Sequence, residues 1–113
     1  MAREAALCAK FHTAVELIGR RWSGAVVQLL VRGPARFAEL RHAIPDITDR
    51  MLSERLRELE KEGIVLRTVI PDTPVRVEYA LTTKGRGLEP ALAAIGKWAE
   101  RWVEPGKAAR RAR

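Results

Sequence analysis

Apolar side chains recur at helical spacing in the first third of the chain. Over residues 5–18 they fall three and four positions apart, which places one apolar stripe along an amphipathic helix. Residues 22–31 are apolar on most sides, which predicts a shorter and more deeply buried helix. Gly33 and Pro34 follow and end it, because proline supplies no backbone donor and clashes with the preceding turn.

Two further helices are predicted to lie close together in the middle of the chain. Residues 37–43 provide only two turns before Pro45 and Asp46 force a break. Thr48 is a good N-cap, and Asp49 favours the positive end of a helix dipole. Strong helix formers then run to Gly63, so a longer helix is expected over residues 49–62.

After this helix the period changes to two. Apolar and polar side chains alternate over residues 75–82, which predicts a half-buried strand. Residues 64–70 are rich in β-branched side chains, and residues 71–74 form a turn, so residues 64–82 predict one hairpin.

A last helix is predicted from its N-cap Thr83 to about Val103. Pro90 bends this helix near Arg86, or alternatively the firm part of the helix begins only near Pro90. Two closely spaced helices ahead of a two-stranded wing indicate a mainly helical α+β protein with a winged helix-turn-helix fold.

Length and charge limit what such a fold can do. The 113 residues have room for one domain, which we assign to residues 1–104, and we expect a basic, disordered tail over residues 105–113. The net charge is +7, of which the tail carries +4 and residues 1–104 carry +3. This balance favours a polyanionic partner such as nucleic acid. The apolar runs are far shorter than the roughly 20 residues of a membrane span, and no signal peptide pattern is present, so we expect a cytoplasmic protein.

Catalytic and metal-binding chemistry has little support in the sequence. There is no Gly-rich phosphate loop and no nucleophile motif, and Cys8, His12 and His42 lack the spacing of metal ligands. We therefore expect no enzymatic activity, no metal and no cofactor.

The helix over residues 49–62 separates its side chains into two faces. At 100° per residue, Leu52, Leu56 and Leu59 form one narrow stripe. The opposite face carries Arg50, Ser53, Glu54 and Arg57. Arginine can bond guanine in bidentate fashion, serine can meet a base edge or a phosphate, and glutamate can accept from cytosine. The alternative is that these residues only form ion pairs on a solvated helix, worth tenths of a kcal/mol.

Two arginines of the hairpin are further candidates for DNA contact. Arg67 and Arg76 can face the minor groove or flanking phosphates, or they can pair with Glu78 or Asp72. For Arg76, at the hairpin tip, we favour a phosphate contact.

Four phrases of the chain together resemble the HxlR-type regulators. They are LIGRRW (17–22), GPARFAEL (33–40), MLSERLRELE (51–60) and VEYALTTKG (77–85). The resemblance spans roughly residues 8–102 and implies a dimeric winged helix-turn-helix protein that binds operator DNA as a repressor or an activator. It places the recognition helix at residues 48–62, starting with Thr48, and the wing around residues 71–76. Arg36 lies where the DNA backbone can pass, although pairing with an acid inside the domain explains it equally well.

Cys8 is a candidate redox sensor. The resemblance implies such a role, because many HxlR-type regulators carry an N-terminal cysteine that senses oxidants or electrophiles. A helix start, with Lys10 and His12 nearby, has features that can make a thiol reactive, whereas a buried, inert cysteine explains the same sequence. Since the chain has one cysteine, any disulfide must join two subunits or a small thiol.

The terminal helices offer more apolar surface than so small a core needs. This favours a homodimer, although the tryptophans can also close over the core of a single chain. The predicted interface residues are Leu7, Phe11, Val15, Leu92, Ile95, Trp98 and Trp102. A small-molecule effector near Trp98 or Trp22 is an open candidate.

The sequence therefore predicts a homodimeric regulator that reads double-stranded DNA at a pseudo-palindromic operator and responds to an oxidant or a small molecule. The alternative is a winged-helix module that binds an acidic protein through Arg50, Ser53 and Arg57, without specific DNA readout.

Overall fold

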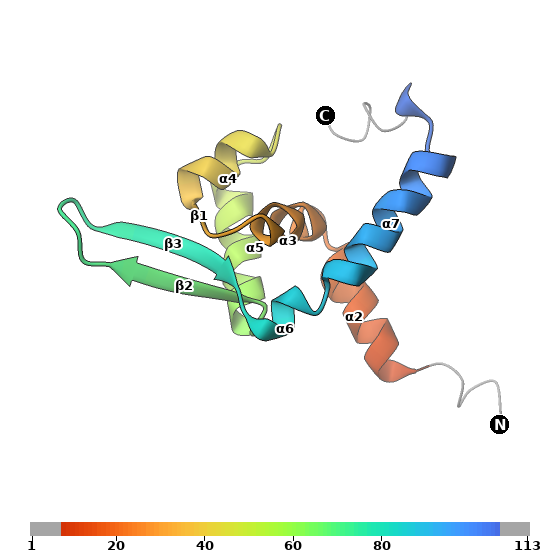
Figure 1. Cartoon of the computed structure of the whole chain (residues 1–113), viewed down its shortest axis with the longest axis horizontal. Helices are drawn as coiled ribbons and strands as arrows, with labels where there is room; N and C mark the ends of the chain where they lie inside the picture. The colour runs from red at the N-terminus through yellow and green to blue at the C-terminus, as the bar shows by residue number, and fades with distance from the viewer. Residues whose placement is uncertain (1–7, 107–113) are drawn as a thin grey trace.

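Helices make up most of the computed structural model, which describes residues 8–106 (Figure 1). In chain order the elements are α2 (Ala9–Gly19), α3 (Ser23–Val31), β1 (Ala35–Arg36), α4 (Phe37–Ala43), α5 (Asp49–Lys61), β2 (Val65–Ile70), β3 (Arg76–Leu81), α6 (Thr83–Arg86) and α7 (Glu89–Trp102). The mainly helical winged helix-turn-helix fold predicted from the sequence is confirmed.

The sheet has three strands rather than the two that the sequence predicted. Its order is β1-β3-β2, and both pairings are antiparallel. Arg67 faces Tyr79 across the hairpin, and Ala35 faces Tyr79 from the other side. A two-residue strand such as β1 shows no period in the sequence, so only its partner β3 reveals it. The hairpin β2–β3 projects from the helices as a wing (Figure 1).

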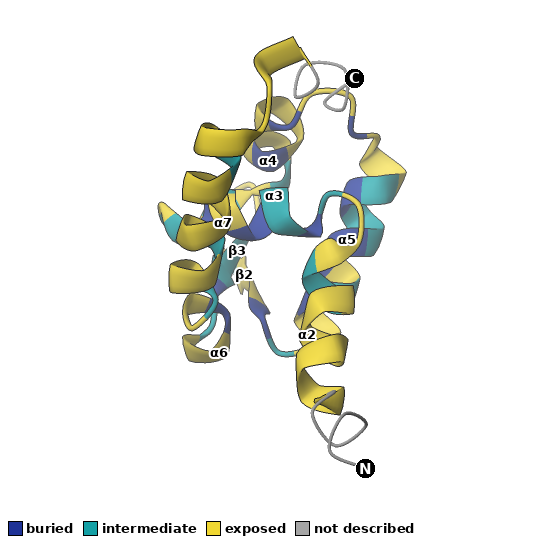
Figure 2. Ribbon diagram, turned by 90° about the vertical axis from the view of Figure 1, so that its right-hand side faces the viewer, coloured by how far each residue is buried: buried dark blue, intermediate teal, exposed yellow. Residues whose placement is uncertain are grey.

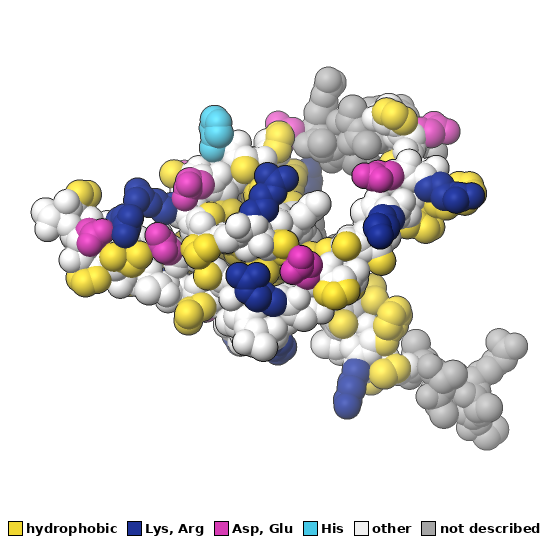
Figure 3. All heavy atoms as spheres, viewed as in Figure 1, with side chains coloured by type: hydrophobic (Ala, Val, Ile, Leu, Met, Phe, Trp, Pro, Cys, Tyr) yellow, Lys and Arg dark blue, Asp and Glu magenta, His cyan; other side chains and the backbone are white. Residues whose placement is uncertain are grey.

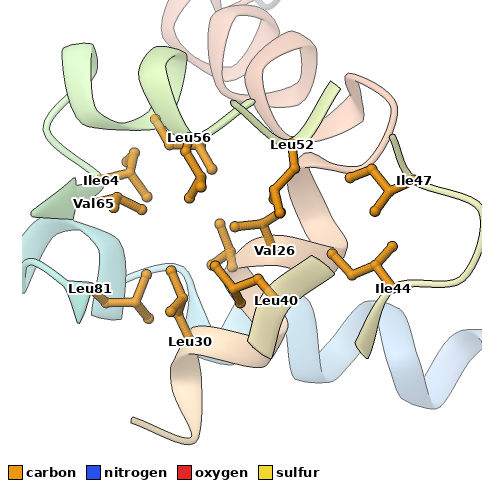
Figure 4. Close-up of a cluster of buried hydrophobic side chains, with 12 residues drawn as sticks. Val26, Leu30, Leu40, Ile44, Ile47, Leu52, Leu56, Ile64, Val65 and Leu81 are labelled. Atoms are coloured by element: carbon orange, nitrogen blue, oxygen red, sulfur yellow. The ribbon is translucent and has the colours of Figure 1, made fainter. Parts of the chain in front are cut away.

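The core lies where α3, α5 and the base of the hairpin meet, as Figure 4 shows. Its buried apolar residues are Val26, Val27, Leu30, Leu40, Ile44, Ile47, Leu52, Leu56, Leu59, Ile64, Val65 and Leu81. Burying each leucine side chain contributes about 1.5–3 kcal/mol relative to leaving it in water. The predicted stripe of α5 is confirmed, since Leu52, Leu56 and Leu59 are all buried.

Local signals fix both ends of α5. The hydroxyl of Thr48 accepts a hydrogen bond from Met51 N at 3.1 Å, as an N-cap does. At the other end Gly63 takes a φ of 75°, and the amide of Ile64 reaches back to Leu59 O at 2.8 Å. This hydrogen bond closes the last turn, and Gly63 permits it because a residue without a Cβ adopts a positive φ at little cost. An ion pair of 2.8 Å between Arg41 and Asp49 ties α4 to the first turn of α5.

The C-terminal helix is divided into α6 and α7, with Pro90 in the first turn of α7. The interpretation in which the firm helix begins near Pro90 is therefore correct. Proline fits there because the first amides of a helix have no partner within it. The N-cap of α6 is Thr82, whose hydroxyl accepts from Gly85 N at 3.0 Å, and not Thr83 as predicted. The shift is one residue, since β3 ends at Leu81 and leaves Thr82 in extended backbone.

Helices α2 and α7 are largely exposed (Figure 2). Neither contains a buried residue. They are joined to the core through partly buried side chains, among them Leu17 from α2 and Leu92 from α7. The first turn of the predicted N-terminal helix, with Leu7, lies outside the described residues, and so does the tail from residue 107 onward.

Candidate nucleic-acid interface

The polar face of α5 is open to solvent. The Arg50 side chain is 88% exposed, Arg57 is exposed, and Ser53 is half-buried beside them. The leucine stripe on the other side fixes the rotation of the helix about its axis. These side chains therefore point away from the core, as the helical wheel predicted. A helix presented in this way can enter a major groove, with arginine and serine side chains facing the base edges.

Glu54 lies within a chain of alternating charges along α5. One of its carboxylate oxygens is 3.3 Å from Arg50 Nε, and the other is 3.6 Å from Arg55. Glu58 continues the chain, with Arg55 at 3.2 Å and Arg20 at 3.0 Å. Each carboxylate is thus shared between two cations. The ion pairing that the sequence left open for Arg50 and Glu54 is present in the structure.

Arg55 and Arg20 were not singled out from the sequence. Arg55 falls on the leucine side of the wheel and its side chain is only 9% exposed, so it needs the two glutamates beside it. A charged residue on an apolar face was the signal that could have identified it. Arg20, at the C-cap of α2, gave no such signal, because its partner Glu58 is distant in sequence.

The hairpin arginines differ from each other. Arg67 is exposed on β2, whereas Arg76 is half-buried and its Nε lies 3.1 Å from Asp72. Figure 3 shows basic and acidic side chains next to one another at the far end of the hairpin. Pairing within the wing was the interpretation that we favoured less for Arg76, and the structure contains it. A phosphate contact by Arg76 requires that this pair open.

Arg36 and Thr48 precede the two helices of the helix-turn-helix. Arg36 is exposed, and among residues 8–106 no carboxylate oxygen lies within 4.0 Å of its guanidinium group. Its backbone amide donates to Glu39 at 2.8 Å, which starts α4. Thr48 is exposed and caps α5 through its oxygen, so its hydroxyl proton is still available to a phosphate.

The predicted interface residues of α2 and α7 form an apolar surface on the single chain. Five of them expose half or more of their surface: Phe11, Val15, Ile95, Trp98 and Trp102. Figure 3 shows hydrophobic side chains among charged ones over these two helices. Leu92 is different, because it is partly buried against the core. Exposed large apolar side chains on these two helices make them the candidate interface of the chain.

Cys8 is exposed, at the N-cap position of α2, so the cysteine is not buried in the single chain. His12 lies 3.3 Å from Glu16. Trp22 packs on the core under the guanidinium of Arg21, whereas Trp98 lies open on α7.

From residue 8 to residue 106, no group of three or more His, Cys, Asp or Glu side chains is placed to hold a metal ion. No helix there is long and apolar enough to cross a membrane.

Comparison with known proteins gives matches along most of the chain. A family model described as HxlR-like helix-turn-helix matches residues 17–107. YvaP of Bacillus subtilis, named an uncharacterized HTH-type transcriptional regulator, is 50% identical over 99 residues, which cover 88% of this chain and 92% of the relative. The HTH-type transcriptional regulator YodB of the same organism is 45% identical over 100 residues, covering 88% and 89%.

Solved structures match the fold at similar identity. The reduced form of the transcriptional regulator YodB from B. subtilis has a TM-score of 0.79 at 44% identity, covering 88% of this chain and 97% of that one. The redox regulator HypR in its oxidized form has a TM-score of 0.80 at 40% identity, covering 85% and 99%. A quinone-bound form of YodB has a TM-score of 0.75 at 40% identity, covering 85% and 100%.

Proposed function

This chain belongs to the HxlR-like helix-turn-helix family of transcriptional regulators, and we propose that it binds a specific double-stranded DNA operator as a homodimer. The observation that carries the proposal is the division of α5 into a buried leucine stripe and an open face with Arg50, Ser53 and Arg57. Regulators of this family act through DNA rather than as enzymes. The proposal places the protein in the cytoplasm, where it meets the DNA that it regulates.

In this proposal each subunit lays α5 in the major groove of one half-site. Arg50 bonds a guanine edge, and Ser53 and Arg57 each meet a base edge or a phosphate. Glu54 holds Arg50 at 3.3 Å, so its first contribution is to orient that arginine. Thr48, Arg36 and the wing arginines Arg67 and Arg76 contact the backbone. A twofold dimer places the half-sites about one DNA turn apart on a pseudo-palindrome.

The direct test is a gel-shift titration against operator DNA, identified by mapping bound genomic fragments, and against scrambled DNA of the same length. Replacing Arg50 and Arg57 with alanine should abolish the preference for operator, since the bidentate pair of Arg50 to guanine contributes about 1–3 kcal/mol of discrimination. Arg86→Ala is the matched control, because Arg86 is exposed on α6, outside α5 and the hairpin. Equal binding of wild type to both duplexes at every salt concentration would remove the claim of specificity.

The alternative function is a protein-interaction module that uses the same arginine face. It predicts that Arg50→Ala and Arg57→Ala weaken binding to an acidic protein and leave DNA binding unchanged. Among residues 8–106 no carboxylate oxygen lies within 4.0 Å of Arg57, and such a cation suits either partner. The paired measurement on both ligands therefore separates the two functions.

The homodimer is supported by the apolar surface of α2 and α7. A second copy of the chain covers Phe11, Trp98 and Trp102 in a symmetric, self-complementary interface. The effector of such a dimer can act at this interface, near the open ring of Trp98.

We also propose that Cys8 makes the regulator responsive to oxidants or electrophiles. Two observations support this: the thiol is exposed, and similar regulators have been solved in reduced, oxidized and quinone-bound forms. The test is release of operator DNA after treatment with diamide or a quinone, with Cys8→Ser as the control. If wild type and Cys8→Ser release DNA equally, or neither does, the thiol is not the sensor.

A further inference from the structure

A small hollow lies between α5 and the wing. Its volume is about 190 Å³, and its lining combines hydroxyl and guanidinium groups with one leucine and one carboxylate. The lining residues are Ser53, Leu56, Arg57, Glu60, Arg67 and Tyr79. Pockets for small molecules begin at about 300 Å³, so this hollow suits one ionic group better than a drug-sized ligand.

The two arginines of the hollow differ from most of those along α5 and the wing. Arg50, Arg55 and Arg76 each have a carboxylate partner. Within residues 8–106, no carboxylate oxygen lies within 4.0 Å of Arg57 or Arg67, although Glu60 lines the same hollow. Two uncompensated cations that face one small space repel each other, and an anion placed between them removes that cost.

Tyr79 is the residue of the hollow that lies on the central strand of the sheet. It lies on the central strand β3, with Arg67 of β2 on one side and Ala35 of β1 on the other. Its phenol can donate a hydrogen bond, and so can the hydroxyl of Ser53 on α5. From the sequence, Tyr79 is predicted only as part of a half-buried strand. The hollow gives it a second role, because a hydroxyl donor beside two arginines suits a tetrahedral oxyanion.

We propose that this hollow binds one backbone phosphate of the DNA, with Arg57, Arg67 and Tyr79 as its ligands. The inference rests on the proposed function. With α5 in a major groove and the hairpin over the neighbouring minor groove, the strand that separates the two grooves must cross the space between α5 and β2. A phosphate clamped there fixes the register of α5 against the bases without reading any base itself.

The test uses operator duplexes in which one phosphate at a time is replaced by a neutral methylphosphonate. Wild type should lose affinity at the linkage that occupies the hollow. On the unmodified duplex Arg67→Ala should weaken binding roughly tenfold and lower the slope of log K against log salt by about one. Tyr79→Phe keeps the packed ring and removes only the hydroxyl, and it should weaken binding several-fold.

The decisive comparison combines variant and duplex. On the duplex with that one neutral linkage, Arg67→Ala and Tyr79→Phe should bind as wild type does, because the contact is already lost. Both variants should also weaken operator and scrambled DNA by the same factor, since a phosphate carries no sequence information. Any effect of Arg86→Ala relative to wild type should be the same on the modified and the unmodified duplex, because Arg86 lies outside the hollow. Thermal melting of each variant checks that it is folded.

Three results would overturn the proposal. If the two variants bind like wild type while operator is still preferred, the hollow holds no phosphate and the proposed function stands. If they change the base preference instead, these residues read bases. If inorganic phosphate binds at micromolar concentration and the duplex does not displace it, the site belongs to a free anion. Failure of wild type to bind any duplex removes both the hollow and the proposed function.

Discussion

Gly85 lies in α6 with its Cα facing the backbone of the segment that leads into β2. A Cβ added there would overlap the carbonyl oxygen of Ile64 and come within 3.1 Å of the Leu81 side chain. The obstacle is backbone and cannot rotate away, so Gly85→Ala should cost about 1–3 kcal/mol of unfolding free energy. Urea denaturation followed by circular dichroism measures this. Gly19→Ala is the control, since a Cβ at Gly19 meets nothing within 4 Å; equal midpoints for the two variants would contradict the packing argument.

Thr48 contributes to stability through its cap and, in our proposal, to DNA binding through its hydroxyl. Thr48→Ala removes the acceptor of the Met51 amide and should lower the free energy of unfolding by about 1 kcal/mol. Thr48→Ser keeps an oxygen at the same place and should retain most of that stability. Thermal melting of the three proteins at equal concentration tests this, and a serine variant as unstable as the alanine variant would show that the hydroxyl is not what caps α5.

At the residue scale, the sequence predicted side chains whose environment is local. The cap at Thr48 and the leucine stripe of α5 depend on neighbours within one or two turns, so spacing alone identifies them. The pairing of Arg20 with Glu58 depends on how α2 packs against α5, and the left-handed backbone of Trp22, with a φ of 77°, depends on the turn between α2 and α3. Neither has a periodic signature.

Helix α5 carries two kinds of charged residue with opposite roles. Glu58 neutralises Arg55, whose side chain is 9% exposed, whereas Arg50 is held only at the surface. Glu58→Ala leaves Arg55 with Glu54 alone and should cost about 1.5–3 kcal/mol of stability. Arg50→Ala should cost less than about 1 kcal/mol, because exposed ion pairs contribute little.

DNA binding should rank these two variants in the reverse order. At a temperature where both are folded, Arg50→Ala should lose operator preference and Glu58→Ala should keep it, as measured by urea denaturation alongside gel shifts. If Glu58→Ala abolishes operator preference as completely as Arg50→Ala does, the charge chain is part of the recognition surface and not only of the scaffold.

At the scale of elements, periodic segments were predicted well and aperiodic ones were not. The bounds of α4 were predicted to the residue, because Pro45 and the Arg-Gly-Pro segment before it leave little choice. Strand β1 was missed, since two residues cannot show a period and its existence depends on β3. The division between α6 and α7 was visible only as an alternative, because Pro90 permits either a bend or a helix start.

At the scale of the whole molecule, the two outer helices α2 and α7 contain no buried residue in the single chain. Helices α2 and α7 are exposed along most of their length (Figure 2), and Phe11, Trp98 and Trp102 on them are exposed, while the hairpin and α5 carry the candidate DNA contacts. Sequence patterns identified these rings as surplus apolar surface. They could not show which helix of a second copy meets which, because that geometry is a property of two chains.

A charge introduced on α7 should therefore separate dimerisation from folding. Ile95 is 57% exposed on the single chain, so Ile95→Asp disturbs no core contact and should fold, but it buries a carboxylate wherever a second copy packs on α7. We expect a monomer in analytical ultracentrifugation at micromolar concentration. Leu66→Asp is the matched control, because Leu66 is 56% exposed on the hairpin, and it should remain a dimer.

The same variant tests whether two half-sites act together. A dimer that has bound one half-site meets the second at an effective concentration near the millimolar range, so a monomer should bind the full operator about 10²- to 10⁴-fold more weakly. Its affinity for an isolated half-site should match that of wild type, since α5 and the wing are unchanged. If the Ile95→Asp protein stays dimeric, α7 does not form the dimer interface. If it is a monomer that binds the full operator as tightly as wild type, dimerisation does not couple the recognition helices of the two subunits.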